Sequence, residues 1–98
     1  MTKGPYQILF EIARLSGIGN AAMTEYALWK EILIDLGGTF KASMLKTDVM
    51  NAILIIKGGV RADKEITILR EIVKVIGGSW GLLDTKPRLL KKIYDNWT

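Results

Sequence analysis

The sequence contains no cysteine and no histidine among its 98 residues. Without these side chains the chain has no disulfide framework, no thiolate nucleophile, no histidine acid–base catalyst and none of the usual zinc ligands. The three kinds of catalytic or metal site that small domains use most often are therefore excluded. We expect no metal, no cofactor and no small-molecule substrate, and we predict that the protein is not an enzyme.

Other residues do not supply the missing chemistry. Most carboxylates fall on the predicted solvent faces of helices, and the serines have no histidine that could activate them. The Gly-Gly pairs close helices, whereas a phosphate-binding loop opens one. These observations agree with a non-catalytic protein.

Long apolar runs are also absent. No stretch approaches the roughly 20 apolar residues that span a bilayer, so we expect no membrane partner. The first apolar segment is interrupted by Glu11 and Arg14, which predicts a part of the fold and not a signal peptide. With 49% hydrophobic and 24% charged residues, the composition is typical of a globular protein. The length predicts a single domain over residues 1–98.

The sequence does contain an internal repeat. Three segments, 28–38, 49–59 and 68–78, end on Gly-Gly, and fainter copies occupy 6–17 and 89–97. An isoleucine recurs at the same place in each copy, with a period of about 20 residues. These isoleucines are Ile12, Ile32, Ile53, Ile72 and Ile93.

Each copy reads as a short amphipathic helix with a glycine stop. In the second copy Leu28, Ile32 and Leu36 are spaced to form one apolar stripe. Glycine after the last turn adopts the left-handed conformation that ends a helix. The repeat therefore predicts an all-α fold, a small compact domain of about five short helices, most of them with Gly-Gly caps.

Helix starts and one alternative complete the fold prediction. Proline suits a first turn, and Thr and Asp suit an N-cap. These predicted starts are Pro5, Pro87, Thr24, Thr47, Asp63 and Thr85. Because residues 52–69 are rich in β-branched side chains, a β-hairpin in this segment is the alternative to helix.

The third copy is apolar almost all round, which predicts either a central helix or an oligomer contact. Phe10, Ile34 and Ile55 fall on faces that should be polar, so neighbouring helices cover them or they form an interface. Trp80 lies between glycines, either as a plug over the core or as an anchor for a partner. The predicted partner or oligomer interface therefore consists of Phe10, Ile34, Ile55 and Trp80.

The last copy predicts a second kind of surface. Arg88, Lys91 and Lys92 lie on one side of the expected helix, with Lys86 just before them. With a net charge of +4, such a face could contact the phosphates of a nucleic acid. Alternatively, the cations complement charges around them, and Asp95 interrupts the basic face.

The repeated Leu/Ile-x-x-x-Ile-x-x-x-Leu-Gly-Gly pattern, clearest in residues 26–43, resembles short helical repeats in virion proteins of tailed bacteriophages. The resemblance implies a non-enzymatic structural or interaction protein of a virion or similar assembly. Its partners would be further copies of itself or other virion proteins. It would be found in the virion, or in the host cytoplasm before assembly. The alternatives are a small basic helical adaptor that binds nucleic acid and a phage-encoded inhibitor of a host protein.

Overall fold

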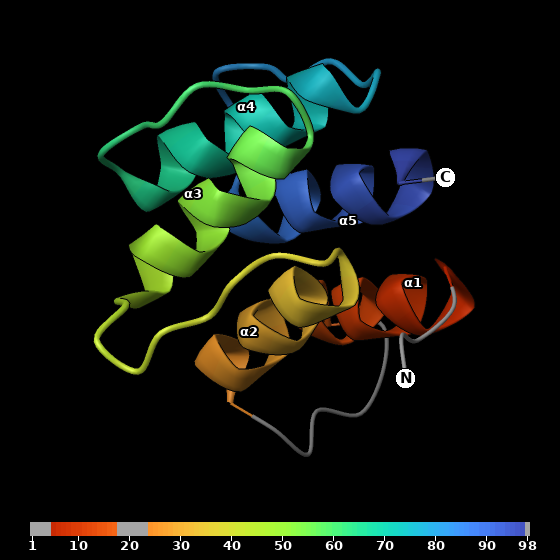
Figure 1. Ribbon diagram of the computed structural model, residues 1–98. Helices are drawn as coiled ribbons and strands as arrows, with labels where there is room; N and C mark the ends of the chain where they lie inside the picture. Colours follow the sequence, from red (N-terminus) through yellow and green to blue (C-terminus); the bar gives the residue numbers. More distant parts are fainter. Residues whose placement is uncertain (1–4, 18–23, 98) are drawn as a thin grey trace.

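The described part of the chain consists of five short helices. The computed structural model describes residues 5–17 and 24–97, in which no strand occurs (Figure 1). The helices are α1 (Pro5–Leu15), α2 (Glu25–Asp35), α3 (Lys46–Ile56), α4 (Glu65–Val75) and α5 (Lys86–Asn96). The predicted all-α fold is confirmed, and each helix has 11 residues, or three turns. The hairpin alternative for residues 52–69 is wrong, because α3 and α4 occupy the two ends of that segment.

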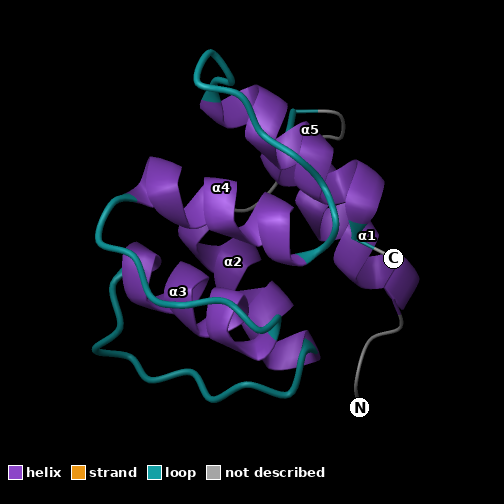
Figure 2. Cartoon of the chain, turned by 90° about the horizontal axis from the view of Figure 1, so that it is seen from above, coloured by secondary structure: helices purple, strands orange, loops and turns teal. Residues whose placement is uncertain are grey.

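The helices form a closed ring. Each described helix packs against its neighbours in sequence, and α5 packs against α1 (Figure 2). The core fills the space between them: the five repeat isoleucines and Trp29 are all completely buried. The prediction of a central third helix is wrong, since α3 packs only against α2 and α4 among the described helices.

Helices α2 to α5 are roughly parallel and run in the same direction. In Figure 1 each of them begins at the left of the molecule and ends at the right, and each loop returns across it. Consecutive helices joined by short connections are usually antiparallel, so this arrangement needs a reversal after every helix. The reversals coincide with the glycine pairs.

The first glycine of each pair ends its helix in the left-handed conformation. Gly37 has φ +83°, Gly58 +97° and Gly77 +99°. In α2 the amide of Gly38 donates to the carbonyl of Leu33 at 3.0 Å, and the amide of Gly37 donates to Ile34 at 2.9 Å. These two bonds satisfy carbonyls that the helix end would otherwise leave unpaired. The predicted role of glycine as a helix stop is confirmed for this position.

The second glycine of each pair is needed for a different reason. A Cβ atom on Gly59 would lie 2.3 Å from Cδ1 of Leu54, and one on Gly38 would lie 2.3 Å from Cδ1 of Leu33. The chain therefore leaves each helix directly across a buried side chain of its last turns. The sequence pattern predicts a Gly-Gly pair at the helix end. It does not show that the first glycine is needed for its backbone conformation and the second for close packing.

The observed helix starts agree only in part with those predicted from the sequence. Thr24 is the N-cap of α2, and its Oγ1 accepts from the amide of Ala27 at 3.2 Å. Thr85 is the N-cap of α5, and Pro87 lies in the first turn. Thr47 and Asp63 are wrong as N-caps, because Leu45 and Lys64 hold those positions. Asp48 compensates in α3: its Oδ2 accepts from the amide of Leu45 at 2.9 Å.

We expect Gly37→Val to destabilise the protein by about 1–2 kcal/mol, because a β-branched side chain is strained at positive φ. No atom lies within 4 Å of the added Cβ, so conformation and not crowding is tested. Gly37→Asn is the matched control, since asparagine tolerates the left-handed region, and it should cost clearly less. The measurement is chemical denaturation, and equal losses for both variants would contradict the assignment.

Candidate functional site

The four predicted interface residues are all exposed. The exposed fraction is 54% for Ile55, 45% for Phe10, 42% for Ile34 and 36% for Trp80. They come from α3, α1, α2 and the loop between α4 and α5, so they belong to four different elements of the ring. For Phe10, Ile34 and Ile55 the explanation that neighbouring helices cover them is wrong.

Trp80 is held against the surface by a cation. The guanidinium of Arg70 lies 4.6 Å from the centre of the indole ring. The same contact occurs two repeat units earlier, where Lys30 lies 4.7 Å from the ring of Phe40. In both places a helix cation fixes an aromatic residue of the loop that follows. Trp80 is therefore partly a covering residue, and only one part of its surface is available to a partner.

The loops after α2 and α4 also share a turn. In the first, the amide of Met44 donates to the carbonyl of Lys41 at 3.0 Å; in the second, Asp84 donates to Gly81 at 3.0 Å. In both turns the amide of the first residue also donates to the side chain of the last residue. The Lys41 amide donates to the Met44 sulfur, and the Gly81 amide donates to the Asp84 carboxylate. The two loops are thus built alike.

What these turns display is different. The second turn presents Leu82 and Leu83, which are 80% and 89% exposed, where the first has Ala42 and Ser43. Because the first turn forms without large apolar side chains, the turn itself does not require the two leucines. We call Leu82 and Leu83 the leucine tip. Sequence analysis missed it, although aligning the two loops on their Gly-Gly pairs would have placed Leu-Leu against Ala-Ser.

A ring of four charges joins the starts of α2 to α5. The Nζ atom of Lys86 lies 2.7 Å from Glu25 Oε1 and 2.8 Å from Glu65 Oε1. The Nζ atom of Lys46 lies 3.0 Å from Glu65 Oε2 and 3.7 Å from Glu25 Oε1. Each of these residues is the first of its helix, and the signs alternate around the cycle. We call these four residues the charge ring.

The two lysines of the charge ring stand where a helix disfavours them. The N-terminal end of a helix carries a partial positive charge, which stabilises Glu25 and Glu65 but opposes Lys46 and Lys86. Their carboxylate partners offset this cost, so the lysines hold neighbouring helices together and do not stabilise their own. Sequence analysis missed this cluster, although the alternation Glu, Lys, Glu, Lys is visible once the copies are aligned.

The pKa values of the charge ring follow its ion pairs. Burial raises the pKa of Glu65, but hydrogen bonds from Lys86 and Lys46 lower it more, and the net pKa is below the ordinary value. Burial lowers the pKa of Lys86, whereas its bonds to Glu25 and Glu65 raise it above the ordinary value. Both charged forms are therefore favoured in the folded protein.

The predicted nucleic-acid residues are mostly paired with carboxylates. Lys86 belongs to the charge ring, Lys91 lies 2.8 Å from Asp95 Oδ1, and Lys92 lies 2.6 Å from Asp84 Oδ2. Arg88 is exposed. Binding to phosphates would require these cations to leave or share their partners, which reduces the gain from releasing counterions.

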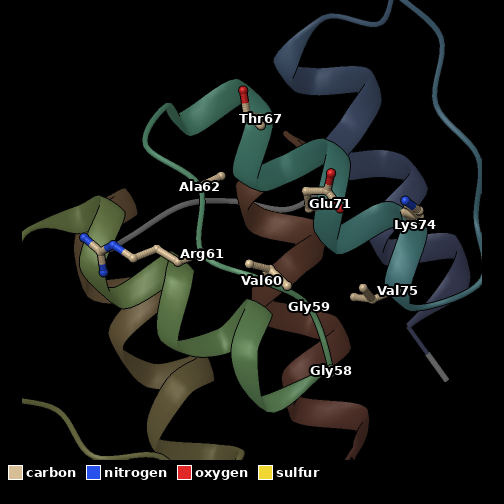
Figure 3. Close-up of a pocket in the computed structure, with 9 residues that line it drawn as sticks. All are labelled: Gly58, Gly59, Val60, Arg61, Ala62, Thr67, Glu71, Lys74 and Val75. Carbon is tan, nitrogen blue, oxygen red and sulfur yellow. The ribbon is translucent and has the colours of Figure 1, made fainter.

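A groove of about 580 Å³ lies between α4 and the loop that precedes it (Figure 3). Val60 from the loop and Val75 from α4 line its sides, and Glu71 is its one carboxylate. Arg61 extends away toward the start of α3, where its Nη2 lies 3.0 Å from Asp48 Oδ1. The groove therefore holds no paired carboxylates for acid–base chemistry.

Two other kinds of site are absent from residues 5–17 and 24–97. No three or more His, Cys, Asp or Glu side chains in this part of the chain are grouped so that they could hold a metal ion. None of the described helices is long and apolar enough to cross a membrane.

The chain matches no model of a known protein family, no curated protein and no solved structure.

Removing one lysine of the charge ring should destabilise the fold. We expect Lys86→Met to cost about 1–2 kcal/mol, because two carboxylates at converging helix starts lose their shared cation. Lys91→Met removes the same charge from an exposed pair within α5 and should change stability by less than about 0.5 kcal/mol. Urea denaturation of both variants measures this difference. Equal losses would show that the charge ring adds nothing beyond a surface pair.

Acid should weaken the fold through Glu65. Because its pKa is lowered by folding, its stabilisation is present above the unfolded pKa of roughly 4.3 and is lost as pH falls through the native value. We therefore expect the native protein to lose more stability than Glu65→Gln between neutral pH and the acid range. Denaturation at a series of pH values measures the difference in unfolding free energy between the native protein and Glu65→Gln. This difference should become smaller as the pH falls. If the difference in unfolding free energy did not depend on pH, the lowered pKa of Glu65 in the folded protein would be wrong.

Proposed function

We propose that the protein is a non-enzymatic structural or interaction component of a larger assembly, acting through protein–protein contacts. The repeat pattern that resembles tailed-phage virion proteins favours a virion as that assembly, with further copies of the chain or other virion proteins as partners. The protein would then reside in the virion, or in the host cytoplasm before assembly.

The leucine tip is the observation that carries this proposal. Two adjacent leucines that are almost fully exposed cost solubility, and the sister turn with Ala42 and Ser43 forms without them. An apolar contact with another protein would bury both side chains, at roughly 25 cal/mol for each Å² removed from water. Exposed Ile34 and Ile55 offer further apolar surface on α2 and α3.

A nucleic-acid adaptor is the second candidate. The net charge of +4 and exposed Arg88 favour it. The pairing of Lys86, Lys91 and Lys92 with carboxylates argues against it, because a phosphate would have to compete with Glu25, Glu65, Asp95 or Asp84. A phage-encoded inhibitor of a host protein would use the same apolar contacts as the first proposal.

Sedimentation velocity over a range of concentrations tests the proposal. We expect the native protein to self-associate, and the double substitution Leu82→Ala with Leu83→Ser to weaken association by about tenfold or more, since two buried leucines are lost. The substitutions copy the sister turn, so the helical circular dichroism signal should be unchanged.

Leu45→Ala is the matched control, because Leu45 is also an exposed leucine but caps α3. It should leave association within about twofold of the native value. A native protein that stays monomeric and shifts a DNA fragment at moderate salt would contradict the proposal and favour the adaptor.

A further inference from the structure

The three most exposed large apolar side chains of the described residues lie on two surfaces of opposite shape. Leu82 and Leu83 project from a turn, whereas Val60, which is 80% exposed, lines the groove between α4 and the loop that precedes it (Figure 3). The volume of this groove, about 580 Å³, lies within the range of roughly 300–1,000 Å³ that is found for ligand sites. The groove can therefore admit two adjacent leucine side chains.

The groove is open because the side chains of α4 do not cover the loop beside it. Before α3 and α5, the side chains of Ile56 and Asn96 come within 3.1 Å of the place that a Cβ atom would take on the second glycine. Val75 has the corresponding position in α4, but the three atoms nearest to that place on Gly59 all belong to Leu54. The loop before α4 thus lacks the cover that the other two loops receive.

Glu71 gives this groove a charge that the fold does not use. The corresponding residue of α5 is Lys92, whose Nζ donates to the Ser79 carbonyl at 3.0 Å and ties that helix to its loop. A carboxylate has no proton to donate to a carbonyl, so Glu71 cannot make the same contact. Within residues 5–17 and 24–97 it forms no ion pair. Glu71 can therefore accept from a cation that another molecule brings.

Arg88 is the matching charge beside the leucine tip. Asp84 follows the leucine tip directly in the sequence and lines one hollow together with Arg88. Asp84 is already paired with Lys92 at 2.6 Å, and Arg88 forms no ion pair in the part of the chain that the structure describes. The tip and the groove are therefore both apolar, one convex and one concave, and each has an unused charge of opposite sign.

We infer that the groove binds the leucine tip of a second copy of the chain. The two leucines lie against Val60 and Val75, and the Arg88 guanidinium donates to the Glu71 carboxylate. Such a pair can be bidentate, which fixes the orientation of the tip as well as adding affinity. The tip does not fill the groove of its own chain, because both leucines are exposed. The inference rests on the proposed function, to which it adds the surface that receives the tip.

Charge reversal followed by sedimentation velocity tests this contact. We expect Glu71→Arg alone and Arg88→Glu alone each to weaken self-association by about tenfold or more, since like charges then face each other. An equimolar mixture of the two variants should associate as the native protein does, because each variant meets a partner of opposite charge. Arg88→Glu places an acidic residue in the first turn of a helix, and Glu71 is partly exposed, so both variants should keep the helical circular dichroism signal.

Lys41→Glu is the matched control, because it reverses one exposed cation beside the sister turn, outside both the groove and the leucine tip. It should leave association within about twofold of the native value. A native protein that stays monomeric, or a mixture that associates no better than either variant alone, would overturn the inference. Association that is lost with the leucine tip but is unaffected by both charge reversals would overturn it too, and would leave the proposed function standing.

Amide chemical shifts of the ¹⁵N-labelled native protein give a second measurement that needs no variant. As the protein concentration rises, we expect shifts to change both at residues 58–62 and at residues 81–84. Changes confined to residues 81–84 would show that the leucine tip contacts some other surface, and the inference would be wrong.

Discussion

The structure depends on one constraint, which is that five helices too short to fold alone must share one core while most of them point the same way. An isolated helix of three turns is marginal in water, so each must bury its apolar stripe against two neighbours. Parallel neighbours require the chain to recross the molecule after each helix. The Gly-Gly pairs allow this return, since one glycine reverses the backbone and the next clears the side chains beneath it.

The parts of the fold that depend on local chemistry could be predicted from the sequence. Spacing of isoleucines marks the inward face, and glycine marks each helix end, because both effects act within a few residues. Ring closure could not be predicted, because α1 and α5 are brought together by three-dimensional packing. The prediction that α3 is a central helix was wrong for the same reason. Its apolar composition suggested burial on all sides, but Ile55 and Ile56 are exposed in the folded protein.

The site was predicted less completely. Exposure of Ile34, Ile55 and Phe10 follows from helical periodicity, which identifies the outward face. The pairing of Lys86 does not, because its partners Glu25 and Glu65 are distant in sequence and meet only in the closed fold. The leucine tip became evident only when two loops of equal construction were compared, since exposure of a loop side chain depends on how the turn is held.

The charge ring also has a consequence for how the ring of helices is closed. Lys86 contacts both Glu65 and Glu25, so the start of α5 is tied directly to the start of α2. The helices α2 and α5 do not otherwise pack together, because α1 lies between them in the ring. The start of α1 lies at the opposite end of the molecule in Figure 1, so α1 is not part of this cycle. Two closures therefore coexist: the helices close as a set of five around their core, and their charged starts close as a set of four that excludes α1.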